Sequence, residues 1–164
     1  MKKLLFVLLA AAVLGALGLL PFRAVDSAKL LPVKTVIVTK SGETYTVDIG
    51  AGVRAVGRSL REALNRLREE VTGEVFLPTA EQVIITEPVD EAVEAVAEES
   101  EFRPAAGIYR TPEPFPDAEA LGAYLESHPS NVTILDVRAA LALGQRPRVP
   151  VIRAADGGFL VDDE

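Results

Sequence analysis

The stretch from Gly57 to Glu87 constrains the fold most, because a helical pattern and a strand pattern follow one another in it. Ser59 and Glu62 have the spacing of a capping box, which begins a helix. Apolar residues then recur with helical periodicity, at Leu60, Ala63, Leu64 and Leu67. We therefore expect a helix whose leucine stripe packs on a sheet, while its Arg and Glu side chains face solvent.

The second half of this stretch predicts the start of that sheet. Gly73 provides the flexible backbone that commonly ends a helix. Pro78 divides the following residues into a short extended piece and an apolar strand from Gln82 to Thr86. A strand this apolar is expected to lie inside the sheet rather than at its edge.

Hairpins are predicted near both ends of the exported part of the chain. Apolar and polar residues alternate on either side of Ser41 and Gly42, and again around residues 156–158. The paired apolar positions of the first hairpin are Val36 and Val38 on one strand and Tyr45 and Val47 on the other. Three glycines between Gly50 and Gly57 predict a loop after it.

Three more helices are predicted further along. The segment after residue 87 is amphipathic, with Val89, Val93 and Val96 on one face and Asp90, Glu94 and Glu98 on another. A strand over residues 103–111 and a Pro-rich connector precede a helix from Asp117, and residues 132–144 begin extended and become a helix. The sequence therefore predicts an α/β or α+β fold: a single mixed sheet with terminal hairpins and about four packed helices, behind an N-terminal apolar helix.

The first 23 residues have the character of a membrane anchor. Lys2 and Lys3 precede an uncharged apolar run over residues 4–22, which as a helix would cover about 28 Å, close to the thickness of a bilayer's hydrocarbon core. We expect a single-pass anchor in a bacterial cell membrane, with the lysines cytoplasmic and the domain extracytoplasmic. The alternative is a secreted protein cleaved near Ala16-Leu17-Gly18. The predicted organisation is an anchor over residues 1–23, a tether over 24–32 and a single exported domain over 33–164.

Composition excludes several classes of function. The chain has no cysteine, which excludes disulfides, cysteine nucleophiles and thiolate metal sites. From Leu30 onward, 23 acidic and 13 basic side chains leave a net charge of −10. Such a surface repels phosphate backbones, so we expect no nucleic-acid binding.

Few side chains suggest chemistry of their own. Asp90, Glu94 and Glu98 could offer oxygen ligands to a divalent cation, but the glycine turn of a calcium loop is missing, and we interpret them as a solvated helix face. His128 precedes Pro129 at a predicted helix end, and no serine has nucleophile-elbow spacing. We therefore predict no catalytic residue, no cofactor and no metal site.

The segment from Gly57 to Glu87 also resembles part of the N-terminal domain of the Ger(x)C family, the C-subunit lipoproteins of spore germinant receptors. The likeness lies in a Gly-led helix (SLREALNRLREEV), a short aromatic-containing strand (VFLP) and an apolar strand that closes on Glu87 (QVIITE). A later stretch, LDVRAALALGQRPRVPVI, looks like the family's helix followed by a Pro-Val strand, so the likeness extends from Leu31 to Ile152. Members of that family carry a lipid on an N-terminal cysteine, and here the apolar leader would replace it. The resemblance implies a part in a sporulation or germination assembly.

These observations favour a non-enzymatic, membrane-anchored extracytoplasmic accessory domain that acts by protein contact. We expect the rings of Tyr109 and Phe115, around the Pro-rich connector, to be exposed and to form the contact surface, or else a free strand edge to do so. The alternatives are an exported module that binds a small ligand or a cell-wall fragment, and an enzyme that uses carboxylates such as Asp136 and Glu126.

Overall fold

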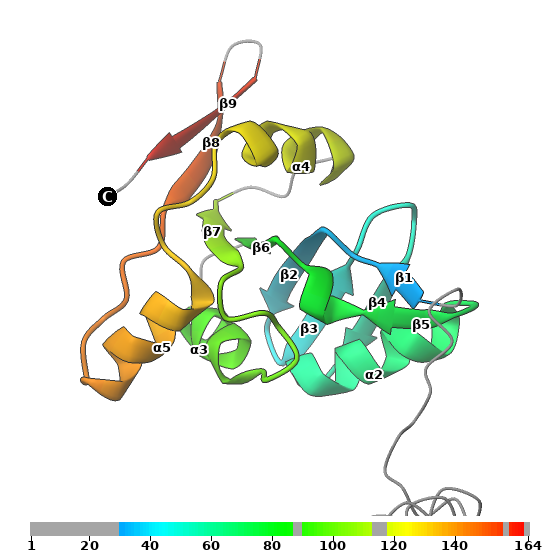
Figure 1. Ribbon diagram of the computed structural model, residues 1–164. Coiled ribbons are helices and arrows are strands. Elements are labelled where there is room, and N and C mark those ends of the chain that lie inside the picture. Colours follow the sequence, from blue (N-terminus) through cyan, green and yellow to red (C-terminus); the bar gives the residue numbers. More distant parts are fainter. Residues whose placement is uncertain (1–29, 87–89, 113–117, 156–157, 163–164) are drawn as a thin grey trace, which may run out of the picture.

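The computed structural model describes residues 30–86, 90–112, 118–155 and 158–162 (Figure 1). Seven strands form one mixed sheet in the order β4-β3-β2-β6-β7-β8-β9. Their bounds are β2 Thr35–Ser41, β3 Thr44–Asp48, β4 Arg54–Gly57, β6 Gln82–Thr86, β7 Gly107–Thr111, β8 Val151–Ala155 and β9 Gly158–Asp162. The predicted mixed α/β class with a single large mixed sheet is confirmed.

The centre of the sheet is parallel and its margins are antiparallel. Strands β2, β6, β7 and β8 pair in parallel, whereas β3 and β4 extend the sheet on one side and β9 on the other as antiparallel neighbours. Both predicted hairpins are present, as β2–β3 and β8–β9. In the first, Val38 pairs with Val47, and Gly42 adopts φ +56° in the turn, a conformation that glycine reaches without strain.

Helices cover both faces of the sheet (Figure 1). Helices α2 (Leu60–Glu70), α3 (Asp90–Glu98) and α5 (Ile134–Ala142) pack on one face and enclose the larger core cluster. Helix α4 (Ala118–Ser127) packs on the opposite face over a smaller cluster. Because β6 and β7 lie between both layers, their side chains are buried on both sides.

The α2 helix begins as its sequence predicts but ends at Glu70 with an extended Val71 as its C-cap, so the predicted helix stop at Gly73 was wrong. The Ser59 hydroxyl accepts a hydrogen bond from the Glu62 N–H at 3.2 Å, and the Glu62 carboxylate accepts one from the Arg58 N–H at 2.9 Å. The apolar positions that face the sheet are all buried, at Leu60, Ala63, Leu64 and Leu67. Pro78 lies in a short 3₁₀ turn, Leu77–Thr79, between β5 (Glu74–Phe76) and the fully buried β6.

Two strands lie where the sequence pattern predicted none. Residues 54–57, within the predicted glycine-rich loop, form β4, because Ala55 and Gly57 pair with β3 and turn towards the core. Residues 30–32, at the end of the predicted tether, form β1 (Leu30–Pro32), which pairs with β5 as a separate two-stranded sheet. The predicted N-terminal apolar helix lies outside the described residues. Among the residues that are described, no helix has the length and apolar character that crossing a membrane requires.

Candidate functional site

The structure buries one of the two predicted contact residues. Tyr109 is 0% exposed, and its hydroxyl donates a hydrogen bond to the His128 carbonyl oxygen at 3.3 Å. Its ring packs in the small cluster with Leu121 and Leu125 of α4. The prediction that this ring is exposed was wrong, because α4 folds over the face of β7 from which it projects. Phe115 lies outside the described residues.

His128 follows the end of α4, and its Nδ1 atom lies 3.1 Å from the Ser127 hydroxyl. Its ring stacks on Tyr124 with centroids 4.1 Å apart. The Nδ1 atom lies 3.0 Å from the Tyr124 carbonyl oxygen. In the tautomer with a proton on Nδ1, the imidazole donates to this carbonyl and closes the last helical turn.

The two carboxylates considered for hydrolysis each have a local structural partner. Asp136 Oδ2 accepts from the Thr133 N–H at 2.9 Å and from the Thr133 hydroxyl at 2.6 Å, which completes a capping box at the start of α5. The Thr133 hydroxyl, followed by its backbone N–H, holds the pKa of Asp136 below its usual value. Glu126 on α4 pairs with Lys34 at 2.7 Å. Asp136 therefore caps a helix, and Glu126 forms an ion pair.

The acidic residues of α3 divide between two environments. Glu94 and Glu98 are exposed, as predicted for a solvated helix face. Asp90, at the start of α3, instead forms ion pairs with Arg110 and Arg146. In the described part of the chain, no three His, Cys, Asp or Glu side chains are close enough to hold a metal ion together.

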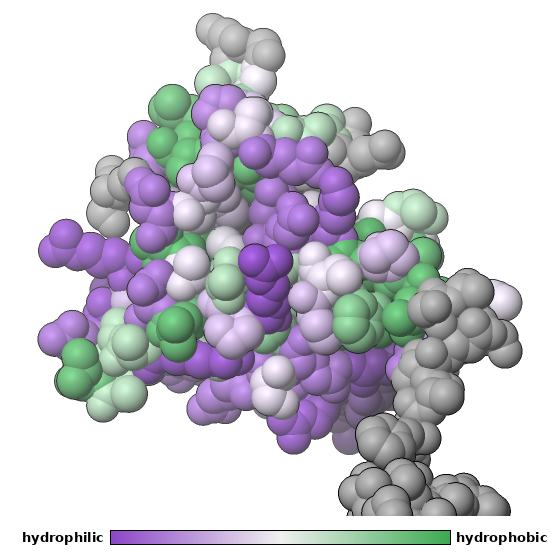
Figure 2. All heavy atoms as spheres, in the orientation of Figure 1, coloured by the Kyte–Doolittle hydropathy of each residue, from purple (hydrophilic) through white to green (hydrophobic). Residues whose placement is uncertain are grey.

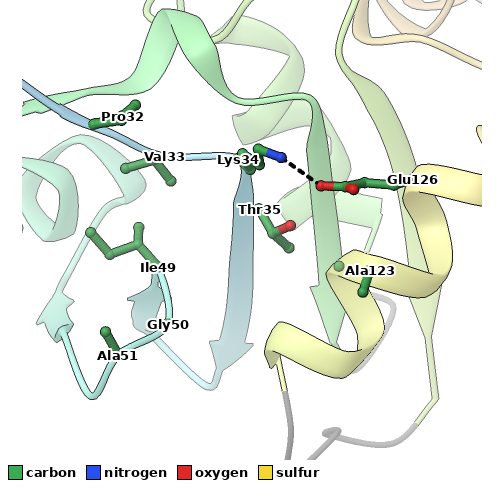
Figure 3. Close-up of a pocket in the computed structure, with 10 residues that line it drawn as sticks. Pro32, Val33, Lys34, Thr35, Ile49, Gly50, Ala51, Ala123 and Glu126 are labelled. Carbon is green, nitrogen blue, oxygen red and sulfur yellow. Dashed lines mark hydrogen bonds and ion pairs between the residues drawn. The ribbon is translucent and has the colours of Figure 1, made fainter.

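A first cleft, of about 500 Å³, lies between the start of β2, the β3–β4 loop and α4 (Figure 3). The Lys34–Glu126 ion pair spans one side of it, and Ile49 contributes apolar surface. Helix α4 approaches β2 closely here because residue 122 is glycine: an added Cβ would lie 2.7 Å from the Thr35 hydroxyl oxygen. The cleft is therefore shaped by a close helix–strand contact beneath it.

The loop at this cleft has an unusual backbone. Gly50, Ala51 and Gly52 all have positive φ, including +52° at the alanine. An alanine with positive φ destabilises the backbone by about 1–2 kcal/mol, so the surrounding contacts must stabilise this conformation. The Asp48 carboxylate accepts from the Gly50 N–H at 2.8 Å, and the Val53 N–H donates to the Gly50 carbonyl at 2.9 Å. The loop is fixed by its own hydrogen bonds rather than by α4.

A second cleft, of about 310 Å³, lies between α3, β7 and the segment that follows α5. Asp90 contacts Arg110 of β7 at 3.0 Å and Arg146 at 2.9 Å, with one carboxylate oxygen for each guanidinium. The Nε atom of Arg110 is buried and has no hydrogen-bond partner among the described residues. This cleft therefore combines paired charges with an unsatisfied buried donor.

The outer side of α5 forms an apolar surface, which we call the α5 face. It consists of residues that are exposed on one side of the helix and just after it: Leu135, Ala139, Ala142 and Leu143. Leu135 is 57% exposed and Leu143 is 73% exposed. Figure 2 shows hydrophobic atoms at the lower left of the molecule, over the end of α5. Neither this surface nor the second cleft was predicted from the sequence.

Comparison with protein-family models, with curated proteins and with solved structures finds no match to this chain.

Proposed function

We propose that this chain is a non-enzymatic accessory domain, anchored in a bacterial cell membrane through residues 4–22, that acts on the extracytoplasmic side by contact with another protein. The observation that carries the proposal is the α5 face. Its two leucines are the most exposed large hydrophobic side chains of the described residues. Burial of a leucine side chain against a partner stabilises a complex by about 1.5–3 kcal/mol.

The spacing of the α5 face indicates what kind of partner it fits. Leu135, Ala139 and Ala142 follow each other at intervals of four and three residues, and so lie along one side of the helix. Two alanines between bulkier leucines allow another helix to approach closely. We therefore expect the partner to present an amphipathic helix with a matching apolar stripe.

The α5 face lies far from the strand that follows the proposed anchor in the sequence. Six residues separate Arg23 from Leu30, so β1 lies within about 25 Å of the end of the anchor. Figure 1 shows β1 and α5 at opposite sides of the molecule. The side that carries α5 is then free to meet a neighbouring protein, and the resemblance to the Ger(x)C family suggests a sporulation or germination assembly as its setting.

Photo-crosslinking in native membranes tests this proposal. A benzoylphenylalanine replaces Leu143 in the full-length chain, and the matched control carries it at Glu69, an exposed position on α2. We expect a discrete membrane-protein adduct from position 143 and none from position 69, with Met1 to Lys3 still present on the captured chain. The same products from both positions, or none from either, would exclude the α5 face as the contact surface.

The second candidate function is an exported module that binds a small ligand or a cell-wall fragment. The cleft of about 500 Å³ in Figure 3 favours it, because this volume is within the range of ligand pockets. The test is the melting temperature of the full-length chain with soluble cell-wall fragments, since a ligand of the native state raises it. A rise that Ala123→Trp abolishes would support this function, and an unchanged melting temperature would count against it.

A further inference from the structure

Arg110 is an unusual residue for the inside of a sheet layer. Its side chain is only 14% exposed, on a strand that is otherwise largely buried. One terminal nitrogen, Nη2, donates to Asp90, but Nε is buried without an acceptor. Leaving a buried donor unpaired is unfavourable, and more so when the group is charged. Arg110 therefore has donor capacity that the described residues do not use.

Asp90 contacts a terminal nitrogen of Arg110 but not its Nε. Its Oδ1 accepts from Arg110, and its Oδ2 accepts from Arg146. Arg146 itself is 77% exposed, so most of its guanidinium is open to a further partner. Two guanidinium groups thus share one carboxylate, and both have N–H groups to spare.

The cleft beside these charges is suited to a small molecule with an apolar part. Val93, Leu141 and Pro147 contribute its apolar lining, and Glu94 adds one carboxylate. It lies near the carboxyl ends of the parallel strands β6 and β7, the edge at which open α/β sheets commonly bind ligands. Asp90, Glu94, Arg110 and Arg146 have charges that sum to zero, so a singly charged ligand is better tolerated than a doubly charged one.

We propose that the second cleft binds a small monocarboxylate. The ligand's carboxylate accepts from accessible guanidinium N–H groups of Arg110 and Arg146, and its short carbon chain lies against Val93, Leu141 and Pro147. A planar carboxylate matches the fork of guanidinium N–H groups, whereas a phosphate brings a second negative charge towards Asp90 and Glu94. The carboxylate belongs either to a free acid or to the C-terminus of a short peptide.

Nitrogen-15 NMR of the full-length chain in detergent micelles tests the proposal directly, through the Nε–Hε signal of Arg110. The probes are butyrate, N-acetyl-alanyl-alanine, the C-terminal amide of that dipeptide, and inorganic phosphate. We expect a saturable downfield shift of this signal with butyrate or the dipeptide acid, and none with the amide or phosphate. Saturation by butyrate identifies a free-acid site, and saturation by the dipeptide alone identifies a chain terminus.

Three variants separate ligand binding from a structural role. Arg110→Lys keeps the charge but removes the Nε donor, and should abolish saturation as followed at the Gln145 backbone amide. Arg146→Gln changes an exposed side chain, so the fold should survive, and binding should weaken about tenfold or more. The matched control is Arg54→Lys, an exposed arginine paired with Asp48, which should bind as the parent chain does.

Several results would overturn the proposal. They are the absence of any saturable shift with both acids, equal saturation by phosphate, or unchanged binding in Arg146→Gln. Unchanged binding in Arg146→Gln would refute the proposal even if Arg110→Lys fails to fold. A protein-contact role of the α5 face would be unaffected by any of them, because that role is read from crosslinking at position 143.

Discussion

Replacement of Gly57 by alanine should force α2 away from the sheet. Gly57 is the last residue of β4 and lies directly against the first turn of α2. An added Cβ would lie 2.9 Å from the carbonyl carbon of Glu62, 3.0 Å from the Cα of Ala63, and closer still to the Ala63 nitrogen. These are backbone atoms of a helix, which cannot rotate aside as a side chain can. The strand and the helix must therefore separate.

The expected loss follows from what this separation disturbs. Residues on the inner side of α2 are almost fully buried, at Leu60, Ala63, Leu64 and Leu67. Overpacking of a well-packed interior costs about 1–3 kcal/mol, and backbone contacts belong at the upper end of that range. A loss of about 3 kcal/mol in the free energy of unfolding corresponds to a fall of about 6–12 °C in melting temperature for a chain of this size.

Far-UV circular dichroism of the full-length chain in detergent micelles measures this fall. The matched control is Gly158→Ala on β9, where an added Cβ meets no atom within 4 Å. That change should alter stability by no more than about 1 kcal/mol, because it mainly restricts the unfolded chain. Equal melting temperatures for the Gly57 and Gly158 variants would refute the packing of α2 against β4.

Three further predictions test the core, the α5 face and the cap of α5. Leu64→Ala should lower the free energy of unfolding by about 2–5 kcal/mol, because the side chain is 1% exposed. Urea denaturation measures this loss, and a negligible shift of the midpoint would contradict the orientation of α2. Leu143→Ser should change stability by less than about 0.5 kcal/mol yet abolish the partner complex, and a large loss of stability would mean that this residue is core. Thr133→Val should raise the pKa of Asp136 towards its usual value, followed by carbon-13 NMR, and an unchanged pKa would exclude the hydroxyl as its cause. Because the pKa of Asp136 is lowered in the native state, its ionised form stabilises the fold at pH values above the usual carboxyl pKa. This stabilisation is lost as the pH falls through the native pKa. The free energy of unfolding of Thr133→Val should therefore depend less on pH in this range.

The parts of the fold that could be predicted are those that local patterns determine. The α2 helix has a capping residue and a regular apolar stripe, and the structure confirms each buried position, although the helix ends at Glu70 rather than at a cap formed by Gly73. The β2–β3 hairpin has alternation on both strands and a glycine at the turn, so Val38 pairs with Val47 as expected, although Tyr45 pairs with Lys40. In these segments propensity, periodicity and turn chemistry all favour the same structure.

The errors arose where distant pairing decides the outcome. Strand β4 has only four residues and ends in a glycine, too few for a periodic signal, and it exists because β3 offers it an edge. Tyr109 stands close to prolines in the sequence, which suggested an exposed ring. It is buried because β7 lies between two parallel neighbours with helices on both faces. The run Gly107–Thr111 contains that signal, since adjacent apolar residues are typical of a central parallel strand.

The second cleft was not predictable for a related reason. Its charged residues are Asp90, Arg110 and Arg146, which are separated by 20 and 36 positions and form no motif. From the sequence pattern we placed Asp90 on a solvated acidic helix face. It lies beside Arg110 because the chain passes from β6 through α3 to the neighbouring parallel strand β7. The one available signal was an arginine within an otherwise apolar strand pattern, because burial of an arginine requires a partner.

The proposed carboxylate site and the α5 face share one segment of chain, which predicts that they are coupled. Leu143 follows the last turn of α5, and Arg146 lies three residues beyond it. A carboxylate held between Arg110 and Arg146 would fix this segment against β7 and so order Leu143 for contact. Binding energies between two sites are reciprocal, so the partner must then strengthen carboxylate binding as the carboxylate strengthens partner binding.

The crosslinking assay reads this coupling. Addition of butyrate to native membranes should raise the yield of the adduct at position 143, and Arg146→Gln should remove the increase without removing the adduct itself. The control is butyrate with the crosslinker at Glu69, which lies on α2 outside the shared segment. The two sites are independent if butyrate saturates the Arg110 signal but leaves the adduct yield at position 143 unchanged. A ligand shifts an equilibrium between two states only by the difference in its affinity for them.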